Sequence, residues 1–176
     1  IEAIQIKLVK KGEKAPGDTK NILHEKGFGV TYSSNIQDDN WMKVVSDGEV
    51  SGTVGKGKRI EEFKVSISSE LLNGTVSYRS YVSGIGWQDY VESGEVSGLD
   101  DHKIEMIQMK LTDELESVYD IYYRVHVSCI GWLDWASNNQ ITGSYKYNYQ
   151  IEAIQIKLVK KGEKAPGNTK DVLHEK

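Results

Sequence analysis

Hydrophobic and polar residues alternate with a period of two in several short stretches of the chain. The alternation is clear from Phe63 to Ile67 and from Ile121 to Val127. A period of two is typical of β-strands that have one buried and one solvated face. No stripe of helical spacing reaches a comparable length, so the pattern predicts an all-β protein.

Three segments of the chain align with one another around a tryptophan. They are VTYSSNIQDDNWMKVVSDGEVSG (30–52), VSYRSYVSGIGWQDYVESGEVSG (76–98) and IYYRVHVSCIGWLDWASNNQITG (121–143), with Trp41, Trp87 and Trp132 at equivalent positions. Each segment runs into a strand-like stretch, at 60–67, 104–111 and 151–158. A repeat of about 45 residues is too short to bury its own apolar face, so the repeats must share one core. We therefore expect a pseudo-threefold, β-prism-like domain of three antiparallel sheets; a β-trefoil is the alternative.

A longer repeat links the two ends of the chain. Residues 151–176 repeat residues 1–26 with 23 of 26 positions identical, which gives a period of 150 residues. This pattern is typical of a piece of a tandem array. The expected divisions are 1–8 as the orphan last strand of a preceding module, 9–27 as an inter-module linker, 28–158 as the three-repeat module (repeats 28–67, 74–111 and 118–158) and 159–176 as a linker to a following module.

Composition and charge limit the partners. Seventeen glycines and ten tyrosines suit an all-β array. The net charge is −4 and the basic residues are scattered, so we expect no nucleic acid partner. No apolar run approaches the length of a membrane span. Cys129 is the only cysteine, and its neighbour Ile130 predicts that it is a small buried hydrophobe.

The residues around the tryptophans form a motif that resembles a known repeat. The motif consists of Ile85-Gly86-Trp87, which returns as Ile130-Gly131-Trp132, then Gly94 and Gly98, then Ile-Glu-x-Ile-x-x-Lys-Leu. It resembles the ChW repeat, the clostridial hydrophobic repeat with a tryptophan, in three complete copies. The resemblance implies a secreted or cell-surface location in a Gram-positive bacterium and a role in adhesion, polysaccharide binding or surface assembly. Asn40 replaces the glycine before Trp41, so we expect the first copy to present a different surface.

The repeat tryptophans have two interpretations. Trp87 and Val91 lie four residues apart, which on an extended strand places them on the same side. This spacing favours Trp41, Trp87 and Trp132 as core residues packed under their repeats. The alternative is a platform on which a sugar ring stacks.

Other aromatic residues are better candidates for a sugar site. The position three residues after each tryptophan is expected on the opposite face, where it carries Val44, Tyr90 and Trp135. An exposed Tyr90 or Trp135 is the better sugar candidate. A run of three tyrosines alternates with Lys146 and Asn148 and predicts three rings on one strand face, as a binding strip, a module contact or a packed surface. The full set of candidate ligand-binding residues is Tyr90, Trp135, Tyr145, Tyr147, Tyr149, Asp89, Asp134 and Asn138.

Signatures of catalysis are weak. The repeated Glu61, Glu105 and Glu152 occur at one position in every copy, which favours a structural salt bridge or turn contact over glycosidase chemistry. The pairs at 38–39 and 100–101 are adjacent carboxylates, but no loop of alternating Asp and Asn ligands surrounds them, so we expect solvated turns and no metal. We expect no enzyme activity and no cofactor.

Two hypotheses remain open. In the first, the module binds a cell-surface glycan or polysaccharide through shallow sites whose avidity comes from repetition. In the second, modules of the same array assemble head to tail into a surface fibre or layer, with the terminal strands joining neighbours. The discriminating features are the exposure of the aromatic candidates and the location of the two IEAIQIKL strands.

Overall fold

The computed structural model describes residues 6, 8–13 and 28–175. The chain folds as three successive repeats that share one pattern of strands. The first contains β1 (Val30–Ile36), β2 (Asn40–Trp41), β3 (Val45–Ser46), β4 (Ser51–Gly52) and β5 (Ile60–Ile67). The second contains β6 (Val76–Val82), β7 (Gly86–Trp87), β8 (Val91–Glu92), β9 (Ser97–Gly98) and β10 (Ile104–Leu111). The third contains β11 (Tyr119–Val127), β12 (Gly131–Trp132), β13 (Ala136–Ser137), β14 (Ile141–Tyr145) and β15 (Ile151–Lys160).

Two further elements complete the described part of the chain. The six-residue helix α1 (Asp113–Val118) joins the second repeat to the third, and β16 (Leu173–Glu175) follows the last repeat. Among the residues that the structure describes, no helix has the length and apolar character needed to cross a bilayer.

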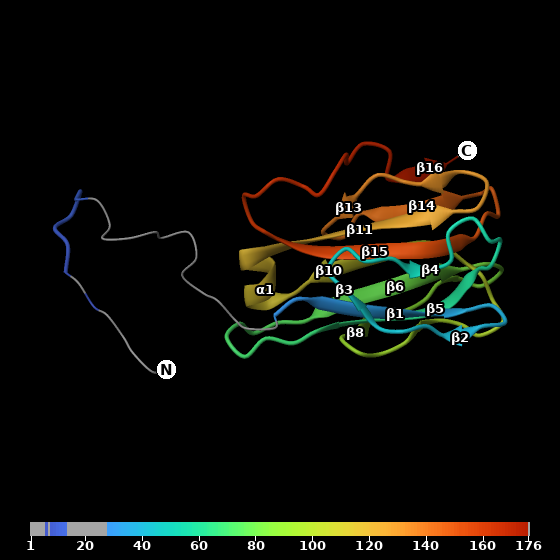
Figure 1. Cartoon of the computed structure of the whole chain (residues 1–176), viewed down its shortest axis with the longest axis horizontal. Coiled ribbons are helices and arrows are strands. Elements are labelled where there is room, and N and C mark those ends of the chain that lie inside the picture. Colours follow the sequence, from blue (N-terminus) through green and yellow to red (C-terminus); the bar gives the residue numbers. More distant parts are fainter. Residues whose placement is uncertain (1–5, 7, 14–27, 176) are drawn as a thin grey trace.

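The strands form three sheets around one core, which confirms the predicted all-β fold with three sheets (Figure 1). Each sheet is built on the two long strands of one repeat. The first sheet is centred on β1 and β5, the second on β6 and β10, and the third on β11 and β15. Pairing within the described sheets is antiparallel except between β14 and β16, which run parallel.

Each repeat donates one strand to the sheet of the repeat before it. Strand β9 of the second repeat pairs with β5, and β14 of the third repeat pairs with β10. Strand β4 of the first repeat pairs with β15 of the last repeat. This last exchange closes the three sheets into a ring, so β15 holds the first and third repeats together.

Glycine is required where each donated strand crosses the sheet that receives it. Gly52, Gly98 and Gly143 occupy this position with φ between 114° and 133°. A Cβ at Gly98 would lie 2.2 Å from the carbonyl oxygen of Glu61, and the other two would meet Glu152 and Glu105 in the same way. The recurring glycine eleven residues after each tryptophan is therefore explained by a backbone crossing.

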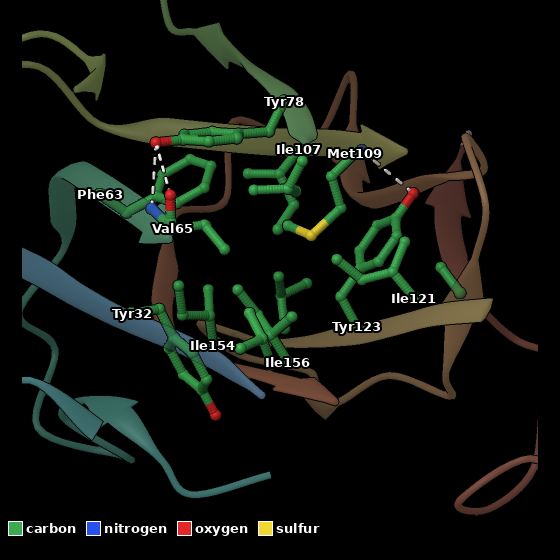
Figure 2. Close-up of a cluster of buried hydrophobic side chains, with 14 of the residues drawn as sticks. Tyr32, Phe63, Val65, Tyr78, Ile107, Met109, Ile121, Tyr123, Ile154 and Ile156 are labelled. Carbon is green, nitrogen blue, oxygen red and sulfur yellow. Dashed lines mark hydrogen bonds between the residues drawn. The ribbon is translucent and has the colours of Figure 1, made fainter. Parts of the chain in front are cut away.

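Three equivalent tyrosines occupy the core where tryptophans were expected. Tyr32, Tyr78 and Tyr123 are at most 1% exposed. The hydroxyl of each donates to a carbonyl 17 residues further on, at Glu49, Glu95 and Gln140. The Tyr78 and Tyr123 hydroxyls also accept the backbone N–H of Val65 and of Met109 in the preceding repeat (Figure 2). The Tyr32 hydroxyl lies beside the backbone of Ile156 in the equivalent place. Each tyrosine thus links its own repeat to the preceding one, as each donated strand does.

The segment after the third repeat packs against the module. β15 continues to Lys160, and β16 pairs with β14, so residues 159–175 are in contact with the domain for much of their length. They were predicted as a linker, and whether a module follows them stays a prediction. The predicted orphan strand 1–8 and linker 9–27 fall mostly outside the described residues.

Candidate ligand-binding face

The repeat tryptophans lie on the outer faces of the sheets, so the prediction that they fill the core is wrong. A one-residue slip in strand pairing explains the error. Tyr81 pairs with Trp87, and Tyr78 pairs with Val91. The step from Trp87 to Val91 is four residues, whereas the matching step on β6, from Tyr81 to Tyr78, is three. An extra residue reverses which face the following side chains occupy. Val91 therefore faces inward and Trp87 outward, and the other two repeats have the same slip.

On the second sheet, the outer face is filled by a stack of aromatic and cationic side chains. The Arg79 guanidinium lies 4.6 Å from the ring centroids of both Trp87 and Tyr90. The ring of Tyr81 lies edge-on to that of Trp87, with 5.6 Å between the centroids. Tyr90 is half-buried, and its hydroxyl donates to Asn139. Trp87 and Tyr90 therefore share one face, contrary to prediction.

The third sheet has an equivalent stack, but there the stack is covered by the polypeptide that follows β15. Arg124 lies 4.8 Å from the rings of both Trp132 and Trp135, and His126 stands edge-on to Trp132 at 5.5 Å. Burial lowers the pKa of the Arg124 guanidinium. Trp135 is only 6% exposed, so its predicted role as an exposed sugar platform is wrong.

The polypeptide after β15 makes this cover. The backbone nitrogen of Trp135 donates to the carbonyl oxygen of Asn168 at 2.8 Å. The Asp134 carboxylate accepts the backbone N–H groups of Lys170 and Asp171, at 3.2 and 3.1 Å. Gly167 lies so close to the indole of Trp135 that a Cβ there would approach it to 3.0 Å. Asp134 thus fixes part of the tail (residues 161–175) on the third sheet.

The outer face of the first sheet is open. Trp41 is 38% exposed, and the Lys64 ammonium lies 4.6 Å from its ring centroid. In the second repeat, Arg79 packs against the tryptophan and against Tyr90. The residues of the first repeat that are equivalent to Arg79 and Tyr90 are the smaller Ser33 and Val44. The first copy does present a different surface, but the difference lies at Ser33 and Val44; Asn40, on which the prediction rested, keeps a positive φ like the glycines of the other repeats.

A hollow of about 80 Å³ lies on this sheet, and Lys64, which contacts the Trp41 ring, is part of its lining. It is lined by Thr31, Tyr32, Ser33, Val44, Lys64 and Ser66. Apolar surface surrounds it, since Met42 and Val44 are 37% and 54% exposed. The first sheet therefore combines an accessible indole, an ammonium group and hydroxyls on one face.

The remaining predicted site residues have other roles. Tyr145 ends β14, and positive φ angles at Lys146 and Asn148 break the extended chain, so the prediction of three rings on one strand face is wrong. Tyr147 stacks on Tyr149 at 5.5 Å and contacts His174 of the tail at 4.5 Å. Asn138 has φ of 41° and shapes a turn, where it bonds Ile121 and Asp120. Asp89 is exposed beside the second-sheet stack.

The prediction for the three repeated glutamates is confirmed. Glu61, Glu105 and Glu152 are buried, and each faces a basic side chain from the same sheet end. Arg59 lies 2.6 Å from Glu61, Lys103 lies 3.9 Å from Glu105, and His126 lies 3.1 Å from Glu152. Arg59 and Lys103 each precede their glutamate by two residues, whereas Gln150 stands at that position in the third repeat and Glu152 lies beside His126 of β11 instead. The glutamates recur at one position in the ring, which supports a structural role, but their partners differ.

The sequence also led to predictions for Cys129 and for the paired aspartates. Cys129 is exposed in a turn with φ of 66°, so its prediction as a buried hydrophobe is wrong. Asp38, Asp100 and Asp101 meet at a polar hollow of about 250 Å³ that Arg59 also lines. Within the described ranges, no group of three or more His, Cys, Asp or Glu side chains is arranged to hold a metal ion.

Comparison with known proteins gives one family match. The family model described as Clostridial hydrophobic W matches residues 35–69 and 126–160, which lie in the first and third repeats. The middle repeat lies outside these matches, although its strands pair in the same pattern. Neither the curated proteins nor the solved structures contain a match.

Proposed function

We propose that this chain is a non-catalytic binding module of a secreted or cell-surface protein, and that it binds a glycan or polysaccharide through the first sheet around Trp41. The observation that carries the proposal is the difference between the three outer faces. The second face is filled by Arg79 between two rings, and the third is covered by the tail. The first face leaves its indole and a hollow accessible.

The chemistry of the first face suits a sugar. The indole of Trp41 offers a flat apolar surface for the C–H face of a pyranose, as aromatic rings do in ligand sites. Thr31 and Ser66 line the adjacent hollow with hydroxyl groups, and Lys64 adds an ammonium donor. These groups would bond sugar hydroxyls or an acidic sugar's carboxylate. A hollow this small gives a weak single site, so useful affinity requires several modules on one protein.

The repeated architecture supports such an array. We propose that the middle repeat is a third copy of the clostridial hydrophobic W repeat, because its long strands, short tryptophan strand and donated strand match those of its neighbours. The 150-residue period supports further modules in the same polypeptide. The extracellular location rests on the family match in the first and third repeats.

The test compares two exposed aromatic residues. Binding to a glycan array and to purified Gram-positive cell-wall polysaccharide is measured for the native chain, Trp41→Ala and Tyr145→Ala. Tyr145 is a matched control, since it is 37% exposed and lies on another sheet. We expect Trp41→Ala to lose binding and Tyr145→Ala to retain it. Equal binding by all three proteins rejects the proposed face.

A second function has one observation in its favour. The chain enters β1 at one end of the module and leaves from β16 at the other (Figure 1). Modules joined in sequence would therefore extend along the long axis, as a fibre or surface layer requires. Light scattering and small-angle scattering on a chain of two full periods test this: an elongated particle of twice the module length supports it, and a compact particle rejects it.

A further inference from the structure

The strand that closes the ring has an identical copy at the other end of the chain. β15 carries the ten residues IEAIQIKLVK, and residues 1–10 carry the same ten. The two copies differ in environment. Ile156 is fully buried and Leu158 is 9% exposed, whereas the equivalent Ile6 and Leu8 are 83% and 97% exposed.

We propose that residues 1–10 of the same chain are a second occupant of the β15 position. The ring then closes through either end of the polypeptide. No ligand takes part in this exchange, so its test is independent of the test of the proposed glycan site.

The β15 position selects for this sequence through its contacts. β15 pairs with β11 along nearly its whole length and with β4 on its other edge. Ile154 and Ile156 project into the core (Figure 2). The carbonyl oxygen of Ile156 also accepts the N–H of Gly48, at 2.7 Å. A segment with identical letters can satisfy each of these contacts in the same register.

The chain can reach this position from its N-terminal side. The far end of β15 lies near the start of the module, because Lys160 pairs with Tyr119 and the ring of Tyr119 lies 5.0 Å from that of Phe28. If residues 1–10 replaced β15, Lys10 would take the place of Lys160. The 17 residues between Lys10 and Phe28 can extend over about 55 Å, far more than this junction requires.

The tail explains why the C-terminal copy occupies the position in the native chain. Residues that follow β15 bond to Asp134 and Trp135, and β16 adds a strand to the second sheet. The N-terminal copy cannot make these contacts while its residue 27 is joined to Phe28, since β16 and the start of β1 lie at opposite ends of the module (Figure 1). The C-terminal copy therefore occupies the position in the native chain, and the N-terminal copy replaces it when a substitution weakens the C-terminal copy.

The experiment uses the full chain and a double-mutant cycle. The variants are Ile6→Asp, Ile156→Asp and the combination of both, studied by urea unfolding and by hydrogen exchange with mass spectrometry. We expect Ile6→Asp to leave the unfolding midpoint unchanged. Ile156→Asp should still unfold cooperatively as a monomer, with residues 1–10 becoming protected from exchange. The double variant should have a folded-to-unfolded ratio at least tenfold below that of Ile156→Asp.

Three results would overturn the proposal. The first is that Ile156→Asp is as unfolded as the double variant, and the second is that residues 1–10 remain unprotected in Ile156→Asp. The third is that Ile156→Asp folds only as a dimer in light scattering, because the occupant would then come from another copy. The milder pair Ile156→Ala and Ile6→Ala, with their combination, repeats the cycle with less damage to the core.

Discussion

The backbone nitrogen of Val65 donates a hydrogen bond to the hydroxyl of Tyr78 at a distance of 3.0 Å. Val65 belongs to the first repeat and Tyr78 to the second, so this bond fastens one repeat to the next in the core (Figure 2). The same tyrosine donates to the carbonyl of Glu95, beside the strand that the second repeat contributes to the first sheet. One buried phenol thus links a repeat's own strand, its donated strand and its neighbour.

The buried phenols make stability sensitive to high pH. Burial raises the pKa of Tyr32 and of Tyr78 to about 12, and it also raises the pKa of Tyr123. Above pH 10 the unfolded phenols lose protons that the folded protein keeps, so the free energy of unfolding should fall as the pH rises from 10 to 12. Urea unfolding at a series of pH values measures this slope. Tyr78→Phe should make the slope shallower; an unchanged slope would contradict the assignment.

Gly98 should tolerate no side chain. Its φ is 114°, and a Cβ would lie 2.2 Å from the carbonyl oxygen of Glu61. Gly98→Ala should cost about 3 kcal/mol or more in the free energy of unfolding, through strain and overlap with backbone. Gly84→Ala is the control, since Gly84 also has a positive φ, of 77°, but has open space around it. It should cost about 1 kcal/mol, and equal losses by chemical denaturation would argue against the crossing.

Thr142 offers a stabilising substitution. Its hydroxyl is buried and has no hydrogen-bond partner among the described residues. In the first two repeats the equivalent Ser51 and Ser97 bond a serine on the neighbouring long strand, but Val125 occupies that place in the third. Thr142→Val should therefore raise the free energy of unfolding by about 1 kcal/mol, because it removes an unpaired buried polar group of similar shape. A loss of stability in thermal or urea unfolding would show that the hydroxyl is satisfied.

The tail should detach when Asp134 is removed. Its carboxylate accepts two backbone N–H groups of the tail, so Asp134→Ala should loosen residues 167–171 and expose Trp135. Quenching of tryptophan fluorescence by acrylamide should rise. Asp89→Ala is the matched control, since Asp89 occupies the equivalent position in the second repeat and the bonds to Lys170 and Asp171 are made by Asp134. Quenching that is the same in both variants would contradict the role of Asp134.

The sequence predicts the fold well because repetition and alternation act over long stretches. The three repeats, the period-two strands from Ile60 to Ile67 and the structural role of Glu61 all follow from patterns that packing preserves. The shared core also follows, since one repeat cannot bury its own apolar face. These features depend on many residues, so a local irregularity does not change them.

The face of the tryptophans could not be predicted in the same way. The inference from Trp87 to Val91 assumed an unbroken strand, and the slip between β7 and β8 reverses the facing of the side chains that follow. The exposure of Trp135 depends on residues more than 30 positions later, which no local pattern reveals. The open first face could have been predicted from Ser33 and Val44, which stand in the aligned positions of Arg79 and Tyr90.

The most direct measurement of the proposed function is a binding titration in which the first face is filled by design. Ser33→Arg with Val44→Tyr gives the first sheet the side chains that occupy the second, where Arg79 lies between two rings. Isothermal titration calorimetry with cell-wall polysaccharide then compares this double variant and Trp41→Ala with the native chain. We expect both variants to unfold at nearly the native midpoint and to lose binding at least tenfold. Native affinity in either folded variant would contradict the assignment of the ligand to the first sheet.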